Sequence, residues 1–184
     1  KKGHMKLSKP KVFKGIFNHH IDERGFLNAM NLKDLLAIPN LNSFSPKYQL
    51  MSLSTKKNIF RGLHYQSYPN LQSKLVIIHS GEITDFVVPF EHPLESKVKI
   101  FDLKAGDILL VPNSYAHGFI TRSDSVNIQY LLDHEYSSES YSGINAIDYV
   151  TKHSDGTKLI VSQKDKDYKK ILLKDWSQGI QLYD

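Results

Sequence analysis

The amino-acid sequence predicts an all-β protein, an antiparallel sandwich or barrel with short peripheral helices. Short apolar or alternating runs recur along most of the chain, and turn signals rich in Gly, Asp and Ser separate them, a spacing typical of such folds. No apolar run approaches the roughly 18 residues that a membrane helix needs. The predicted strands cover residues 12–17, 48–54, 59–66, 74–79, 83–89, 97–103, 107–112, 117–121 and 126–132.

Two segments predict helices. Asn31 precedes Leu32, Leu35 and Leu36, which is the pattern of a capped, short amphipathic turn. Residues 165–173 are rich in lysine and predict a terminal helix. Its lysines are expected to form a solvated face, with a binding patch as the alternative.

Length and composition favour one soluble domain. A chain of 184 residues is typical of a single domain, which we expect over residues 5–184, with residues 1–4 a tag remnant and Met5 the natural start. Without Lys1 and Lys2 the net charge falls by two, from +5 to +3. This small positive charge argues against a nucleic-acid partner but suits an anionic small substrate. The absence of cysteine excludes disulfides and thiol chemistry. With no secretory signal or membrane segment, we expect a cytoplasmic protein without a membrane partner.

Arginine is used sparingly. Three of the 24 basic residues are arginines, and Arg24 and Arg61 each precede a glycine. The guanidinium fork matches phosphate or carboxylate in a way that lysine cannot copy, so these two positions indicate a binding role. The alternative is a turn-capping Arg24 and a surface ion pair for Arg61.

Two histidine segments are similar to the paired motifs of the cupin barrel. His64 lies in the strand predicted over residues 59–66, and His117 follows the next-to-last turn signal. Metal-binding cupins carry a His-x-His pair and a Glu in the first motif, whereas this chain has His64-Tyr65-Gln66 and no carboxylate at a suitable spacing. Two imidazoles alone make a poor metal site, so we expect no metal.

A pocket that contains both Arg61 and His64 requires one departure from regular strand geometry. Strict alternation places Arg61 and His64 on opposite faces of their strand. Both can face one pocket if the strand carries a β-bulge, and Gly62 is a suitable position for it.

Three further residues have ordinary structural explanations. Ser162 and Asp165 fit a capping box, in which the Asp165 carboxylate bonds back to the Ser162 amide. Tyr130 and Tyr136 lie in and after an aromatic strand, where either can be plain barrel packing.

Taken together, the chain resembles the dTDP-4-dehydrorhamnose 3,5-epimerase family. The matching segments run in family order over roughly residues 10–167, and several such segments in order are a specific signal. They are Asp22-Glu23-Arg24-Gly25-Phe26, Arg61-Gly62-Leu63-His64-Tyr65-Gln66, Gln72-Ser73-Lys74-Leu75-Val76, Gly81-Glu82-Ile83, Val111-Pro112, Ala116-His117-Gly118-Phe119, Tyr130, Gly143-Ile144 and Val161-Ser162-Gln163-Lys164-Asp165.

The resemblance implies a cupin-type antiparallel jelly-roll barrel, an isomerase that uses no cofactor, and a homodimer that exchanges N-terminal strands. It implies a nucleotide-diphosphate 4-keto-6-deoxysugar as substrate and a role in carbohydrate biosynthesis for lipopolysaccharide, capsule or another surface polysaccharide. By the same resemblance, the catalytic residues are the base His64, its partner Asp165, the proton donor Tyr130 and the ketone-contacting Lys74. The implied substrate contacts are Arg24, Gln49, Arg61, His117, Tyr136 and Lys164.

The departures from the family cluster away from the proton-transfer residues. Leu50 and Met51 follow Gln49 where the family commonly continues with an acidic residue and Asn, and Ala29 stands at another acidic position. Tyr141 replaces a glutamate. A shorter segment, residues 89–94, replaces the usual Asp-x-Arg and Ser-Pro-Thr stretch. The nucleotide, and whether C3, C5 or both are inverted, therefore stay open.

Two other functions are compatible with a cupin barrel. A nucleotide-sugar 3,4-ketoisomerase tends to carry a second histidine soon after the first, where this chain has Gln66. A non-catalytic sugar-binding cupin need not keep His64, Tyr130 and Asp165 together. Hydrogen-bond contact between His64 and Asp165 favours an enzyme, and a gap wider than one bridging water favours a binding protein.

Overall fold

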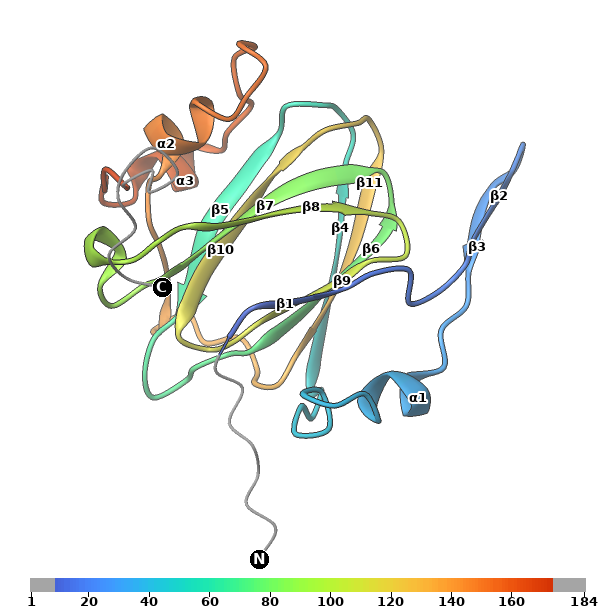
Figure 1. Ribbon diagram of the computed structural model, residues 1–184. Coiled ribbons are helices and arrows are strands. Elements are labelled where there is room, and N and C mark those ends of the chain that lie inside the picture. Colours follow the sequence, from blue (N-terminus) through green and yellow to red (C-terminus); the bar gives the residue numbers. More distant parts are fainter. Residues whose placement is uncertain (1–8, 174–184) are drawn as a thin grey trace, which may run out of the picture.

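A computed structural model describes residues 9–173 of the chain. Two five-stranded antiparallel sheets face each other and enclose the core (Figure 1). The first sheet has the order β1 (Lys11–Phe13), β9 (Ile108–Val111), β6 (Lys74–Ser80), β11 (Val126–Leu132) and β4 (Tyr48–Ser54). The second has the order β12 (Tyr141–Gly143), β5 (Phe60–Gln66), β10 (Tyr115–Thr121), β7 (Glu82–Pro89) and β8 (Lys99–Lys104). The predicted antiparallel, cupin-type jelly roll is confirmed.

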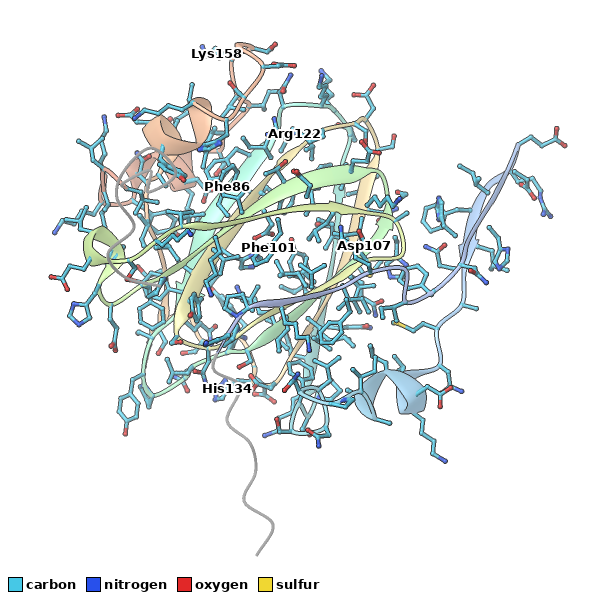
Figure 2. All side chains as sticks on the ribbon, viewed as in Figure 1. Phe86, Phe101, Asp107, Arg122, His134 and Lys158 are labelled. Carbon is cyan, nitrogen blue, oxygen red and sulfur yellow. The ribbon has the colours of Figure 1, made fainter. Side chains whose placement is uncertain are left out.

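Side chains from both sheets fill the space between them (Figure 2). Strands β6, β7, β9 and β10 are buried along most of their length, which explains their continuous apolar runs. Phe86, Phe119 and Phe60 are among the largest fully buried side chains. Burying one such ring contributes on the order of 1.5–3 kcal/mol, so the strands that carry the cavity residues belong to the most rigid part of the molecule.

Eight of the nine predicted strands are present with small shifts at their ends, and those over residues 48–54 and 126–132 have the predicted bounds. The strand predicted over residues 12–17 is wrong beyond residue 13, because β1 spans Lys11–Phe13. Two strand regions were not predicted. One is the three-residue strand β12, and the other is a two-stranded hairpin formed by β2 (His19–Asp22) and β3 (Gly25–Asn28). The hairpin projects beyond the barrel (Figure 1), and the side chains toward its tip stand apart from those of the barrel (Figure 2).

The first predicted helix is confirmed as α1 (Leu32–Leu36), whose N-cap Asn31 accepts hydrogen bonds from the amides of Lys33 and Asp34. The predicted helix over residues 165–173 is wrong beyond residue 167, because α3 spans Gln163–Asp167. The backbone of the following segment pairs instead with Asn145, which bonds to Lys169 and Ile171.

Two short elements complete the periphery. They are α2 (Ile147–Thr151) and the 3-10 turn η1 (Pro93–Glu95). No helix among residues 9–173 is long and apolar enough to cross a membrane. The predicted tag remnant over residues 1–4 and the predicted start at Met5 lie outside the described residues.

Candidate active site

A cavity of about 630 Å³ opens between the two sheets. Residues from β4, β5, β6, β10, β11 and the segment around α3 line it. Eight of the predicted site residues are among them, namely Arg61, His64, Lys74, His117, Tyr130, Tyr136, Lys164 and Asp165. These eight residues therefore share one space, although up to about a hundred residues separate them along the chain.

A bulge in β5 brings Arg61 and His64 to this cavity. His64 pairs with His117 and Arg61 pairs with Phe119, so three steps on β5 face two on β10. The extra residue is at the predicted position, Gly62, which has φ +131°. A Cβ at Gly62 would lie 2.5 Å from the Cα of Gly118, so the close approach of the two backbones requires glycine.

His64 and Asp165 are in direct hydrogen-bond contact. The Nε2 atom of His64 lies 2.6 Å from Oδ1 of Asp165, and the backbone amide of Gly62 donates to Oδ2 at 3.1 Å. A carboxylate only accepts, so His64 donates its Nε2 proton and carries its lone pair on Nδ1. The imidazole side chain is 22% exposed and the carboxylate 6%. This is the arrangement of a base held in one tautomer by a buried acid.

The capping box is only half formed. Ser162 Oγ accepts from the Asp165 amide at 3.2 Å, as an N-cap should, but the Asp165 carboxylate turns to His64 and Gly62. Burial raises the pKa of Asp165, yet the bond and charge of His64, the Gly62 amide and the charge of Lys164 outweigh it and hold that pKa below its usual value. Asp165 is therefore ionised at neutral pH.

A second buried group of ionisable residues forms the cavity floor. Lys74 and Asp85 attract each other electrostatically, and Nδ1 of His117 lies 3.2 Å from Oδ2 of Asp85. Burial lowers the pKa of Lys74 to about 8, against the attraction of Asp85. Burial, followed by the charges of Lys74 and His64, also holds the pKa of His117 well below its usual value, so this imidazole is neutral at pH 7. For Asp85, burial raises the pKa and Lys74 opposes the rise.

Tyr130 provides a protonated hydroxyl at the same cavity. Burial raises the pKa of Tyr130, with a further contribution from Asp85, so the phenol keeps its proton well above neutral pH. Its ring lies 6.3 Å from the ring of His117. Tyr130 comes from β11 in the first sheet, whereas His64 comes from β5 in the second, so a phenol and an imidazole enter the cavity from opposite sheets.

Aromatic rings line the cavity beside His64. The ring of Tyr141 lies 5.4 Å from that of His64 and 5.5 Å from that of Tyr136. The ammonium of Lys164 lies over Tyr141, 4.6 Å from the ring centre. Arg61, at the exposed side, bonds through Nε to Ser54 at 3.2 Å, which leaves its other guanidinium donors for an anion.

Two predicted substrate contacts lie away from the cavity of their own chain. Arg24 is at the tip of the β2–β3 hairpin, where its guanidinium bonds to Asp22 and is 85% exposed. Gln49 is exposed on β4 and accepts a hydrogen bond from Gln129 at 3.1 Å. Neither lines the cavity.

Sequence reasoning missed Tyr141, which lines the cavity, and Asp85, which contacts the cavity residue His117 from behind. Asp85 could have been found, because a carboxylate in the middle of the apolar run Ile83–Val88 must have a buried partner. In the sequence, Tyr141 stood out only because it replaces a glutamate of the family. Its contact with His64 depends on β12, and the three residues of this strand carry no strand pattern. Among residues 9–173, no group of three or more His, Cys, Asp or Glu side chains could hold a metal ion; metal-independent activity stays a prediction.

The barrel and its cavity define a cupin-type protein with the acid and base groups of an enzyme. The sequence profile of the dTDP-4-dehydrorhamnose 3,5-epimerase family matches residues 7–172. The chain belongs to this family of isomerases.

Individual relatives agree with that assignment. The Shigella flexneri dTDP-4-dehydrorhamnose 3,5-epimerase is 32% identical over 145 residues, which is 75% of this chain and 74% of that enzyme. The Salmonella typhimurium enzyme is 36% identical over 94 residues, and this match spans about half of each chain, 49% and 51%. The crystal structure of the Bacillus anthracis enzyme with TDP and PPi bound has a TM-score of 0.70 at 27% identity and covers 93% of this chain and 99% of that one.

Proposed function

We propose that this protein inverts C3, C5 or both in a nucleotide-linked 4-keto-6-deoxysugar. The observation that carries the proposal is the 2.6 Å contact of His64 with Asp165 in a cavity that also contains Lys74 and Tyr130. A ketone at C4 acidifies the C–H bonds at C3 and C5, so one base, one cation and one acid suffice for inversion, and no cofactor is needed.

The first step is removal of a proton by His64. Its Nδ1 lone pair takes the C–H proton, and the electron pair of that bond forms the C=C bond of an enolate while the C4 carbonyl becomes O⁻. The imidazolium that results is stabilised by the Asp165 carboxylate at Nε2.

The enolate oxygen is stabilised by Lys74. A buried cation is worth far more than a solvated one at a site of developing charge, and strands β6 and β7 hold Lys74 and Asp85 in place. When Asp85 is a carboxylate, His117 donates its Nδ1 proton to it and carries a lone pair on Nε2. His117 is then an acceptor for a sugar hydroxyl, and the enolate charge rests on Lys74.

The second step is protonation by Tyr130 from the face opposite His64. The enolate carbon takes the phenol proton, the C4 carbonyl reforms, and the configuration at that carbon is inverted. The imidazolium then returns its proton to the phenolate, directly or through solvent, and the enzyme is ready for another turnover.

The active unit is proposed to be a homodimer. The hairpin exposes Ile21 and Leu27, 72% and 71% exposed, and β4 is a sheet edge with Leu50, Met51 and Leu53 exposed. An unpaired edge and unpacked apolar side chains on one chain fit a second copy of it. In such a dimer the hairpin of one protomer brings Arg24 to the nucleotide diphosphate in the partner's cavity.

The cavity residues constrain the nucleotide of the substrate and the cellular pathway less than they constrain the reaction. A thymidine nucleotide is favoured because the Bacillus anthracis relative binds TDP, while apolar Leu50 and Met51 at the cavity wall differ from the polar residues common in the family. The proposed setting is the cytoplasm and the synthesis of a deoxysugar for a surface polysaccharide.

The alternatives are less favoured by specific observations. Gln66, at the position where ketoisomerases carry a histidine, is buried and uses its amide to hold Asn70, Glu135 and Ser137. A non-catalytic binding protein does not need a buried carboxylate on a cavity histidine.

The test is incubation in deuterated water with dTDP-, GDP- and CDP-linked 4-keto-6-deoxysugars, followed by NMR. We expect deuterium at C3, C5 or both together with inversion, and preference for the dTDP sugar. Movement of the ketone to C3 would instead identify a ketoisomerase, and binding without exchange would identify a binding protein.

A further inference from the structure

A polar cluster joins the β2–β3 hairpin to the barrel at its root. Asn28, the last residue of β3, places its side-chain nitrogen 2.8 Å from the backbone oxygen of His79 and 3.0 Å from Nδ1 of the same histidine. Its side-chain oxygen lies 2.8 Å from Nδ1 of His19, the first residue of β2. One amide therefore connects both hairpin strands to β6.

The hydrogen-bond partners of Asn28 determine where the protons of this cluster lie. A backbone carbonyl only accepts, so the Asn28 nitrogen faces His79 and the Asn28 oxygen faces His19. His79 must then accept at Nδ1 and carry its proton on Nε2, and His19 must donate from Nδ1.

The chain of hydrogen bonds continues to the edge of the sheet. His79 donates from Nε2 to Gln129 Oε1 at 2.8 Å, and Gln129 donates to Gln49 Oε1 at 3.1 Å. Five side chains on β2, β3, β6, β11 and β4 are thus linked with one direction of donation. At its two ends are the hairpin and the exposed edge strand.

The hairpin itself packs little apolar surface against the barrel. Its apolar residues Ile21, Phe26 and Leu27 are exposed, and Figure 1 shows it extending away from the sheets. From the root pair His19–Asn28 to the tip is roughly 10–13 Å at about 3.3 Å per residue. A tilt of about 10° at the root moves the tip by roughly 2 Å, and a misplacement of about 1 Å in a positioned group can cost a hundredfold in rate.

We infer that Asn28 and His79 are positioning residues, which set the direction of the hairpin and thereby the place of Arg24 in the partner's site. The inference rests on the proposed function, because it takes Arg24 as a contact to the nucleotide diphosphate. Asn28 and His79 touch no substrate; they act through Arg24.

The first test is a double-mutant cycle on dTDP binding, measured by calorimetry at pH 7.5. Asn28→Ala is expected to weaken dTDP binding about 3- to 10-fold, the effect of one or two partly buried hydrogen bonds. In an Arg24→Ala background the same substitution should have no further effect, because its consequence passes through Arg24. Additive losses would overturn the inference, since they would indicate a general structural role.

The second test compares His79→Gln with His79→Ala at pH 7.5. Glutamine can accept from Asn28 and donate to Gln129 as the imidazole does, whereas alanine can do neither. We expect His79→Ala to weaken dTDP binding about as much as Asn28→Ala and His79→Gln to keep most of the wild-type affinity. Equal losses in the two variants would contradict the inference.

A third readout separates this inference from the proposed function. Hydrogen exchange of the hairpin amides, residues 20–27, needs no ligand and should be faster in Asn28→Ala than in the wild type. Unchanged exchange would refute the positioning role. Faster exchange in a protein that binds no dTDP would refute the proposed nucleotide contact and leave the anchoring by Asn28 standing.

Discussion

The cavity and the β2–β3 hairpin differ in what surrounds their polar side chains. At the cavity, Lys74, Asp85 and His117 are buried together on strands of the two packed sheets, and Asp165 in α3 is buried against His64. On the hairpin, Arg24 is exposed and pairs with Asp22, two residues away. One chain therefore holds the cavity side chains in place by itself, whereas in the proposed dimer a second copy would surround the hairpin. Chemistry and substrate capture are therefore expected to respond to different substitutions.

The largest effect is expected from the base. His64→Ala should abolish both inversion and deuterium exchange at C3 and C5, a loss of about 10⁴-fold or more in kcat, because no proton can leave without a base. NMR in deuterated water measures both quantities. His92→Ala, at an exposed histidine away from the cavity, is the matched control and should keep full activity. Exchange that persists in His64→Ala would assign the base to another residue.

Removing the charge of Asp165, the partner of the base, should lower kcat somewhat less than removing the base itself. Asp165→Asn keeps the shape of the side chain, but its amide nitrogen faces the ring and favours the wrong imidazole tautomer. We expect kcat to fall by about 10³–10⁴-fold with KM little changed. A variant with full kcat would show that Asp165 serves only as part of the helix cap.

Loss of the proposed proton donor, Tyr130, should separate deuterium exchange from inversion of configuration. In Tyr130→Phe the base and Lys74 remain, so deuterium should still enter with retained configuration while inversion falls by about 10²–10³-fold. Tyr68→Phe, at an exposed tyrosine away from the cavity, is the matched control and should keep full activity. If Tyr130→Phe inverts at the wild-type rate, Tyr130 is a packing residue and Tyr136 becomes the candidate acid.

Deprotonation of Lys74 should cause the loss of activity at alkaline pH. Lys74 must be protonated to stabilise the enolate, and its pKa is lowered to about 8, so kcat/KM should fall as the pH rises through 8, by about tenfold at pH 9. Lys74→Arg keeps its charge at all these pH values. Whatever activity Lys74→Arg retains should lack this alkaline decline, and an unchanged decline would assign it to a different group.

Sequence reasoning succeeded where burial leaves a pattern. The strands over residues 48–54 and 126–132 have the predicted bounds because side chains alternate or are buried along them, and α1 begins at its predicted cap, Asn31. The bulge at Gly62 was required by the joint placement of Arg61 and His64, and the structure contains it. The roles of these residues came from the resemblance, since the residues alone left a structural explanation open for each.

The failures have physical causes. The hairpin buries little of its own surface, so its strands show no apolar alternation, although the turn at residues 22–25 was recognised. The terminal helix was extended too far because a lysine-rich run has helical propensity, whereas the backbone after residue 167 pairs with Asn145. The contact of His64 with Asp165 joins residues 101 positions apart, and no local pattern specifies such a pair.

The most direct test of this account is a subunit-mixing experiment. A dimer is prepared from one His64→Ala chain, which has no base but an intact hairpin, and one Arg24→Ala chain, which has an intact cavity but no arginine at its hairpin tip. If the hairpin serves the partner's cavity, one site in this heterodimer combines an intact cavity with an intact hairpin, and the purified heterodimer should show the wild-type KM with about half the wild-type kcat per dimer. A KM that stays at the raised value of the Arg24→Ala homodimer would contradict the account, because Arg24 would then act within its own chain.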